Sequence, residues 1–573
     1  MRKLLRYMKN YKKESVLAPL FKLLEASFEL ITPLIIASII DTGIANGDKG
    51  YVLSRVLMLV GFGCVGMVSA ITAQYFAAKA AVGFATELRH SLFEKINDLS
   101  FSLLDKVGTS TLLTRITTDV NTVQNGVNLV LRLFMRSPFI VFGACIMAAT
   151  VDLGSLPLFL TVVVLLSIVV FGIMLLTIKR YKAIQNQLDS VMNTTRENLN
   201  GARVIRAFCS EETETEKFVS QNALLSKLQK STGKISALMN PVTYIIINTG
   251  IVVLIYYGAL KVDTGRLTQG QVVALYNYMS QILVELVKLA NLIITITKAF
   301  ASAGRISDVL DIDTSIVYTD DKSNNGTAVE FDNVSIKYNE GANDALSNVS
   351  FTAQPGQIIG VIGGTGSGKT TLVSLISRFY DATEGKVLLG GKDVRSYSLD
   401  EIRNKVHVVL QRAVLFHGSL RDNLLWGNKN ASDDEMLSAV KAAQASDFVL
   451  EKGGLDMEIT AEGRNLSGGQ RQRLSIARAL VGSPEVLILD DSASALDYVT
   501  EKALRTALAQ LENKPTLFIV SQRTSSLRHA DKILVLNDGA LVGCGSHDEL
   551  LENCEVYREI YDSQFGGKES AKK

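Results

Sequence analysis

The chain has 573 residues, enough for more than one domain, and 47% of them are hydrophobic. Its 59 lysines and arginines nearly balance its 57 aspartates and glutamates, so the charge gives no reason to expect nucleic acid as a partner. The five cysteines are scattered without CxxC or metal-ligand spacing, which indicates free thiols rather than a disulfide framework.

Hydrophobicity is concentrated in the first part of the chain. Long apolar runs fill residues 1–305, whereas residues 328–565 alternate short apolar segments with polar, helix-forming ones. A polar, turn-rich join, which contains TDDKSNNGT at 319–327, lies between them. We therefore predict a transmembrane domain over 1–305, a linker over 306–327, a second domain over 328–565 and a disordered tail over 566–573.

Six apolar stretches are long enough to cross a bilayer core, which needs roughly 20 residues. They lie near 16–40, 52–80, 129–150, 156–178, 238–260 and 270–297. Basic residues gather at the N-terminus and in two long segments, 81–127 and 179–237, which places these segments and both termini in the cytoplasm. The long segments are typical of helices that continue the spans. The basic start, MRKLLRYMKNYKKE, is either a helix on the cytoplasmic membrane face or a solvated segment.

Polar side chains occur within two of the predicted spans, where lipid penalises them. Each set is spaced three or four residues apart and therefore shares one helix face. The sets are Lys22, Glu25 and Glu29 in the first span, and Asn277, Gln281, Glu285 and Lys288 in the sixth. One hypothesis is a polar substrate path lined by Glu25, Glu29, Asn277, Gln281 and Glu285. The alternative is that these side chains pair between helices or lie near the lipid headgroups.

A phosphate-binding pattern, G-x-x-x-x-G-K-T, occurs in VIGGTGSGKTT at 361–371. It follows a strand-like run and opens a helix-like one, which is the context that the motif requires. Its backbone N–H groups are expected to surround the phosphates of ATP at a helix N-terminus. The loop residues are Gly363, Gly364, Thr365, Gly366, Ser367 and Gly368. Of the residues that follow, Lys369 should reach the outer phosphates, Thr370 should ligate Mg²⁺, and Thr371 completes the motif.

A carboxylate that could bind the metal and a second anion-binding loop follow downstream. Asp490 ends the apolar run VLILD at 486–490 and is expected to be the second metal-shell carboxylate. The stretch NLSGGQRQRLSIARAL at 465–480 places Ser467, Gly468, Gly469 and Gln470 at the start of an amphipathic helix. Because one nucleotide does not need two phosphate loops from the same chain, we predict that this loop caps an ATP held by another subunit.

With these motifs the chain resembles an ATP-binding cassette (ABC) exporter half-transporter over essentially its whole length. LSGGQ is the signature motif of that family. The resemblance implies a membrane all-α six-helix exporter domain of the type IV ABC transporter fold. This domain is fused to a cytosolic α/β P-loop nucleotide-binding domain.

The resemblance also assigns roles to single positions. It implies that Tyr338 stacks on adenine and that Gln411 contacts the metal and faces the membrane domain. TAEGRN at 460–465 and SALD at 494–497 match the segments that face a partner subunit. Short coupling helices, through which the membrane loops contact the nucleotide domains, are expected near Thr117–Val120 and Ala207–Glu211.

Two catalytic positions depart from the family pattern. Asp491 stands where the catalytic glutamate is expected, and Gln522 stands in place of the switch histidine. Losing one methylene withdraws a carboxylate by roughly 1.5 Å, and a misplacement of about 1 Å can cost about 10²-fold in rate. Gln522 can donate a hydrogen bond to a γ-phosphate but cannot carry the charge of an imidazolium. We predict a degenerate site that binds Mg-ATP and hydrolyses it slowly. The alternative is a working site that has drifted in sequence, because aspartate at 491 is also a carboxylate.

The resulting hypothesis is a heterodimeric multidrug-type exporter of the bacterial plasma membrane, which works by alternating access and has both termini in the cytoplasm. Its partner would be a second ABC half-transporter with the catalytic glutamate and the switch histidine, and its substrate a small amphipathic compound. The alternatives are a homodimeric lipid, peptide or drug exporter that hydrolyses ATP slowly at both sites, an importer on the same fold, and an ATP-driven sensor that does not transport.

Overall fold

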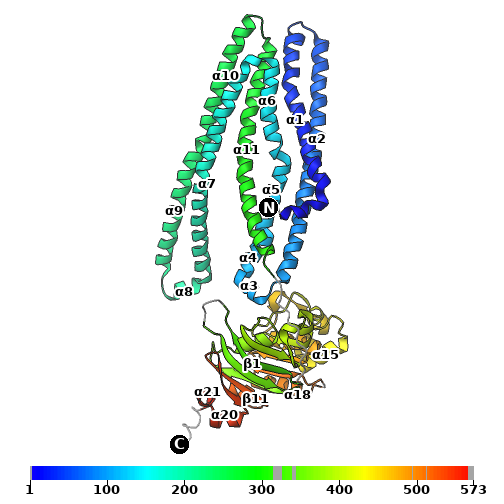
Figure 1. Ribbon diagram of the computed structural model, residues 1–573, viewed down its shortest axis with the longest axis vertical. Coiled ribbons are helices and arrows are strands. Elements are labelled where there is room, and N and C mark those ends of the chain that lie inside the picture. The colour runs from blue at the N-terminus through cyan, green and yellow to red at the C-terminus, as the bar shows by residue number, and fades with distance from the viewer. Residues whose placement is uncertain (1–2, 314–325, 339–342, 493–494, 512, 566–573) are drawn as a thin grey trace. The chain divides into compact units, whose positions relative to one another are not determined.

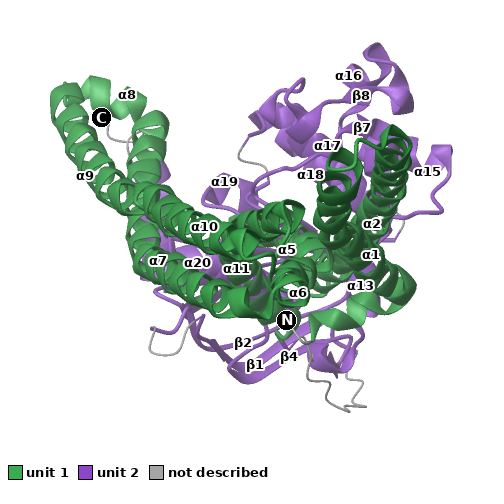
Figure 2. Cartoon of the chain, turned by 90° about the horizontal axis from the view of Figure 1, so that it is seen from above, with its two compact units in different colours: residues 1–98, 108–312 green, residues 99–107, 313–573 purple. Residues whose placement is uncertain are grey.

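The computed structural model describes residues 3–313, 326–338, 343–492, 495–511 and 513–565. The chain divides into two compact units, which are coloured separately in Figure 2. Unit 1 comprises Met1–Asp98 and Gly108–Ile312, and unit 2 comprises Leu99–Val107 and Asp313–Lys573. Most of TDDKSNNGT, the whole predicted tail and Ser494 of SALD lie outside the described residues.

Every regular element described in unit 1 is a helix. A 3₁₀ helix, Leu4–Tyr11, leads into α1 (Lys12–Ser38), which ends in the π-helical turn Ile39–Ile44. The remaining α-helices are α2 (Lys49–Asn97), α4 (Thr109–Thr114), α5 (Val120–Leu129), α6 (Arg136–Val151), α7 (Leu156–Asn200), α8 (Ala202–Ala207), α9 (Glu211–Ala237), α10 (Met239–Asp263) and α11 (Gln269–Leu310).

The described residues contain six helical stretches that are long and apolar enough to span a membrane, which confirms the predicted number. They are Leu4–Ile44, Lys49–Asn97, Thr109–Val151, Leu153–Asn200, Glu211–Asp263 and Gln269–Leu310. Each is at least 41 residues long, about twice what a bilayer core requires. The helices therefore continue past the apolar runs, as predicted. Figure 1 shows α7 and α9 running side by side, with α8 joining their ends.

Unit 2 is built around a six-stranded sheet in the order β12-β11-β3-β10-β9-β6. Its strands are β3 (Ile358–Gly363), β6 (Val406–Val409), β9 (Val486–Asp490), β10 (Thr516–Val520), β11 (Lys532–Asn537) and β12 (Ala540–Gly545). All neighbours pair in parallel except β11 and β12. Every residue of β9 and β10 is buried, as expected for parallel strands covered on both faces.

A second sheet has four antiparallel strands in the order β2-β1-β4-β5. They are β1 (Val329–Ile336), β2 (Leu346–Ala353), β4 (Glu384–Leu389) and β5 (Lys392–Asp393). Phe331 stacks on Phe351 at 4.6 Å between ring centroids, and Phe351 meets Phe518 of β10 edge-on. These aromatic contacts join the two sheets through one core.

The other elements of unit 2 are short. The helices are α3 (Phe101–Val107), α12 (Lys369–Ile376), α13 (Leu399–Lys405), α14 (Leu420–Leu424), α15 (Asp433–Ala442), α16 (Ser446–Glu451), α17 (Gly468–Val481), α18 (Tyr498–Ala509), α19 (Thr524–Leu527), α20 (His547–Asn553) and α21 (Glu555–Phe565). Two residues each form β7 (Gly418–Ser419) and β8 (Glu458–Ile459), which pair with one another.

Helix α3 corrects the first predicted coupling position. Although it lies between stretches of unit 1 in the sequence, it belongs to unit 2, where Phe101 stacks on Phe379 at 4.2 Å. The predicted Thr117–Val120 is wrong, because Asp119 there is buried and paired with Arg305 of α11 inside unit 1. At the second predicted position, α8 ends at Ala207 as a short helix.

Candidate nucleotide-binding site

The loop between β3 and α12 is shaped by glycine. Gly366 and Gly368 have φ values of +83° and +95°, which residues with a Cβ rarely adopt. A Cβ on Gly368 would also lie 2.7 Å from the carbonyl oxygen of Ala345. The chain turns sharply here and delivers its backbone N–H groups to the start of α12, where an anion is favoured.

Lys369 lies folded against this loop. Its Nζ donates to the carbonyl oxygens of Gly363 at 3.0 Å and Gly364 at 2.6 Å. Burial lowers the pKa of Lys369, while the nearby Asp490 and Asp491 act in the opposite direction. The loop thus combines a partly desolvated cation with backbone donors, which is the chemistry that phosphate oxygens require.

Asp490 ends β9 beside the same loop, because β9 and β3 flank β10 in the parallel sheet. Its side chain is buried, and Thr370 Oγ1 donates to Asp490 Oδ1 at 3.3 Å. Burial raises the pKa of Asp490, the neighbouring Asp491 adds to this, and the bond from Thr370 and the charge of Lys369 oppose it. The negative charge of the Asp490 carboxylate is therefore only partly balanced by its neighbours, and a bound cation would stabilise this charged form.

The oxygen donors here suit Mg²⁺. They are the Thr370 hydroxyl, the Asp490 carboxylate and the Gln411 amide oxygen, all hard ligands. Within the described ranges, no group of three His, Cys, Asp or Glu side chains could hold a metal by itself. A sparse protein donor set of this kind is typical of Mg²⁺ that is bound together with substrate phosphates.

Asp491 and Gln411 meet at the mouth of the site. Gln411 Nε2 donates to Asp491 Oδ2 at 3.2 Å, so the amide nitrogen of Gln411 faces the second aspartate. Asp491 has a left-handed φ of +46°, and its N–H donates to the carbonyl oxygen of Val520 at 3.0 Å. Gln522 is exposed and follows β10, the strand next to β9.

An aromatic wall stands beside the loop. Tyr338 is 47% exposed, and its hydroxyl lies 2.9 Å from Thr371 Oγ1, at the start of α12. Tyr380 packs edge-on against the Tyr338 ring, with 5.0 Å between the centroids. The structure thus brings Tyr338 to the phosphate loop, and its contact with adenine stays a prediction.

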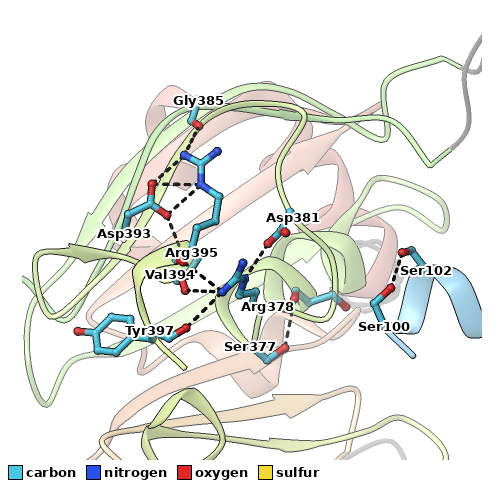
Figure 3. Close-up of polar contacts among 11 residues, drawn as sticks. Ser100, Ser102, Ser377, Arg378, Asp381, Gly385, Asp393, Val394, Arg395 and Tyr397 are labelled. Atoms are coloured by element: carbon cyan, nitrogen blue, oxygen red, sulfur yellow. Dashed lines mark hydrogen bonds and ion pairs between the residues drawn. The ribbon is translucent and has the colours of Figure 1, made fainter. Parts of the chain in front are cut away.

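Tyr380 lies in a segment that Arg378 fixes, and its hydroxyl is bonded to α3. The buried Arg378 donates to the carbonyl oxygens of Val394, Arg395 and Tyr397 and pairs with Asp381, as Figure 3 shows. The Tyr380 hydroxyl donates to Asp105 of α3. Burial, and then this bond to Asp105, raise the pKa of Tyr380, so the phenol stays protonated as a donor.

The signature residues form the start of α17. Ser467 Oγ accepts from the N–H of Gln470 at 3.2 Å, and Gln470 Oε1 accepts from the N–H of Ser467 at 3.1 Å. This reciprocal capping fixes the first turn, in which Gly468 and Gly469 keep the backbone accessible. A Cβ on Gly469 would lie 3.1 Å from the carbonyl oxygen of Ala495, in the SALD segment.

The sequence comparisons agree with this geometry. Residues 15–286 match the family model of the ABC transporter transmembrane region, and residues 346–494 match that of the ABC transporter. The chain is 34% identical to the ABC transporter ATP-binding protein YfiB of Bacillus subtilis (strain 168), over 100% of both chains. The chain belongs to the ABC transporter family.

Two further ABC relatives have more specific names. One is an ATP-dependent lipid A-core flippase of Syntrophus aciditrophicus (strain SB), which is 32% identical over 84% of this chain and 80% of that protein. The other is a putative multidrug export ATP-binding/permease protein, YgaD, of Bacillus subtilis (strain 168), which is 30% identical over 98% and 99% of the two chains.

The fold is also that of an ABC exporter. A structure of a bacterial Atm1-family ABC exporter with ATP bound superposes with a TM-score of 0.81 at 23% identity, and covers 97% of this chain and 98% of that one. The six spans, the family models and the bacterial relatives make the chain a multi-pass inner-membrane ABC half-transporter with a cytosolic nucleotide-binding domain.

In the ABC membrane domain, an arginine that the sequence analysis missed organises the polar residues. Arg136, at the start of α6, donates to Glu285 at 2.7 Å and to Glu29 at 2.6 Å. Glu285 also accepts from Ser137 and Lys288. The available signal was a pair of arginines, Arg132 and Arg136, within the otherwise apolar run at 129–150.

The other candidates for a substrate path make local contacts. Glu25 accepts from Lys22 on its own helix, and Asn277 donates to the carbonyl oxygen of Val273. Gln281 Nε2 lies 3.5 Å from the carbonyl oxygen of Glu29. The contacts of Glu29 and Glu285 correspond to the helix-pairing alternative, and a role in the substrate path stays a hypothesis.

Four apolar side chains that lie near Gln411 in the sequence are exposed on the ABC domain and are here called the apolar patch. They are Leu410, Val414, Phe416 and Trp426. Trp426 is 68% exposed and stacks on Phe416, with ring centroids 4.8 Å apart. Large apolar side chains that are exposed together are typical of surfaces that contact another protein element.

Proposed function

We propose that this half-transporter exports amphipathic or hydrophobic compounds as one half of a heterodimer, in which its own nucleotide site binds Mg-ATP and hydrolyses it slowly. Multidrug-type export is supported by the likeness to YgaD, and a lipid-like substrate by the likeness to the lipid A-core flippase.

The position of Asp491 is the observation that carries the proposal. A general base must come within about 2.6–3.2 Å of the proton that it removes. The Asp491 side chain is one methylene shorter than glutamate, and its backbone is bonded to Val520 and cannot move forward freely. Its carboxylate also accepts from Gln411, which competes with an attacking water.

The binding half of the site has no such defect. Lys369 and the glycine loop can take the phosphates, and Thr370, Asp490 and Gln411 could hold Mg²⁺, which would neutralise phosphate charge when bound. Gln522 stands at the switch position with an amide that can donate to a γ-phosphate. We therefore expect retention of ATP without efficient attack by water.

The intact signature motif argues for an unequal partner. The capping box of Ser467 and Gln470 presents the start of α17 as a regular anion site. A partner that supplies the catalytic glutamate and the switch histidine would use this signature to complete a fully active site. ATP-driven closure would then change the membrane cavity from inward- to outward-facing, and hydrolysis at the partner's site would reverse it.

The test is ATPase activity of the chain co-purified with its partner half. Asp491→Asn is expected to leave most of the turnover, whereas the equivalent change at the partner's glutamate should abolish it. Loss of most activity in Asp491→Asn would contradict the degenerate site. Brisk turnover by the chain expressed alone would favour a homodimer. Uptake of a fluorescent amphipathic dye or lipid into inside-out vesicles separates export from import or sensing.

A further inference from the structure

The loop that carries Gln522 needs outside support. It joins β10 to α19, whose first residue is Thr524. The N-cap residue of α19, Arg523, makes no side-chain cap, although the first N–H groups of any helix need acceptors. Within the segment, the N–H of Arg523 donates to Ser521 Oγ at 3.0 Å, but this bond holds neither the carbonyl oxygen of Gln522 nor the N–H of Thr524.

Gln564 of α21 supplies that support from 40 and 42 residues away. Its Oε1 accepts from both the N–H and the Oγ1 of Thr524, each at 2.9 Å. Its Nε2 donates to the carbonyl oxygen of Gln522 at 2.7 Å. One amide thus caps α19 and holds the peptide group of Gln522. A primary amide suits this place because it accepts at one end and donates at the other.

Helix α21 is anchored firmly enough to act as a support. Tyr557 is fully buried, and its hydroxyl lies 2.7 Å from His547 Nδ1 of α20. Tyr561 packs against both His547 and Phe565. The helix also contacts β11 and α19, and Figure 1 shows it beside β11 and α20. Packing of this kind restricts the positions that Gln564 can take.

We propose that Gln564 is a positioning residue of the nucleotide site, which orients Gln522 toward the terminal phosphate and so makes α21 part of ATP recognition. The inference rests on the proposed function, in which the Gln522 amide contacts the γ-phosphate. Since ADP lacks that phosphate, the quantity that Gln564 controls is the preference of this site for ATP over ADP.

The experiment measures equilibrium binding of radiolabelled Mg-ATP and Mg-ADP to the full-length chain in nanodiscs. Gln522→Ala should reduce the ATP-over-ADP preference about tenfold, the effect of one hydrogen bond to a charged oxygen. Gln564→Ala should reduce it about threefold or more and leave ADP affinity unchanged. In the double variant, Gln564→Ala should add nothing, because it acts through Gln522.

Two variants separate positioning from stability. Ser563→Ala is the matched control, because Ser563 Oγ donates only to the carbonyl oxygen of Ile560 on its own helix. Gln564→Glu keeps both bonds from Thr524 but cannot donate to Gln522 at neutral pH, so it should lose ATP preference even if Gln564→Ala fails to fold.

Each outcome decides one claim. An unchanged preference in Gln522→Ala would refute the proposed contact with the γ-phosphate, and the present inference with it. A loss in Gln522→Ala combined with a wild-type preference in both Gln564 variants would overturn the inference alone. An equal loss from Gln564→Ala with and without Gln522 would also overturn it, because the effect would not pass through Gln522.

Discussion

Asp105 accepts a hydrogen bond from Tyr380, whose ring packs edge-on against Tyr338 beside the phosphate loop. Three contacts therefore connect α3 to the start of α12, since Tyr338 in turn lies against Thr371. Helix α3 joins the second and third spans in the sequence. A change in α3 can thus reach the aromatic wall of the nucleotide site through a short series of side chains.

Tyr380→Phe should weaken this connection and leave nucleotide binding intact. The variant keeps the ring and loses one hydrogen bond to a charged acceptor, worth about 1.5–3 kcal/mol at most. We expect Mg-ATP affinity within about twofold of wild type and a clear loss of substrate-stimulated ATPase activity, measured with the partner half. Tyr397→Phe is the control, because its hydroxyl donates to Leu389 and not to α3. Equal loss of stimulation in both variants would contradict the prediction.

Asp490→Asn should stabilise the nucleotide-free protein and abolish its response to Mg-ATP. The folded-state pKa of Asp490 is raised by burial, so the wild type loses stability as pH rises through the unfolded and then the folded pKa. The asparagine variant should therefore gain most in unfolding temperature at about pH 8 and least at about pH 4. Mg-ATP at a hundredfold excess over its Kd should raise the free energy of unfolding of the wild type by about 3 kcal/mol and leave that of the variant unchanged.

Restoring both catalytic positions should restore hydrolysis. With the partner's own site disabled, Asp491→Glu combined with Gln522→His should raise ATP turnover by about 10²-fold. Each change alone should give a smaller increase, because reach and proton transfer are both needed. Asp491→Asn with Gln522→His is the matched control and should stay inactive. A double variant as slow as the wild type would show that another feature limits the site.

Arg136→Met should destabilise the membrane domain strongly. It leaves Glu285 buried without its arginine, and breaking a buried pair costs about 3–5 kcal/mol. Adding Glu285→Gln should recover much of the loss, as measured by thermal unfolding in nanodiscs. Lys217→Met removes a pair with Glu214 on one surface helix and should cost less than about 1 kcal/mol. If Arg136→Met unfolds like Lys217→Met, the network contributes little.

The phosphate loop, the strand that ends at Asp490 and the six spans could be predicted because each is specified by neighbouring residues. Each of these features is formed by residues that are close together in the sequence, so a sequence pattern can detect it. They are the glycines of the loop, the apolar run of β9 and the long apolar stretches. The same holds for the start of α17, where Ser467 and Gln470 are three residues apart.

The position of helix α3 was harder to predict. Residues 81–127 form one polar, helix-forming segment, and the family resemblance placed the contact with the nucleotide domain at Thr117–Val120. The local signals were Ser100, whose Oγ accepts from the N–H of Leu103, and Gly108, which has a φ of +81°. They mark the two ends of α3. Both signals are weak, and the strong helix formers on either side obscure them in the sequence.

Contacts between distant residues could not be predicted at all. Arg136 lies 149 residues from Glu285, and Gln564 lies 42 residues from Gln522. Neither pair shares a periodic pattern, and only the folded chain brings them together. The sequence analysis therefore missed both contacts. Arg136 holds Glu285, and Gln564 holds the peptide group of Gln522.

Trp426 is the only tryptophan in the chain, and its ring stacks on Phe416 in the apolar patch. Its indole emission therefore comes from one place on the surface of the nucleotide-binding domain. Any protein element that covers this patch would shield the ring from water and shift its emission to shorter wavelength. The molecule thus contains a natural optical reporter, which can follow docking in real time without a label.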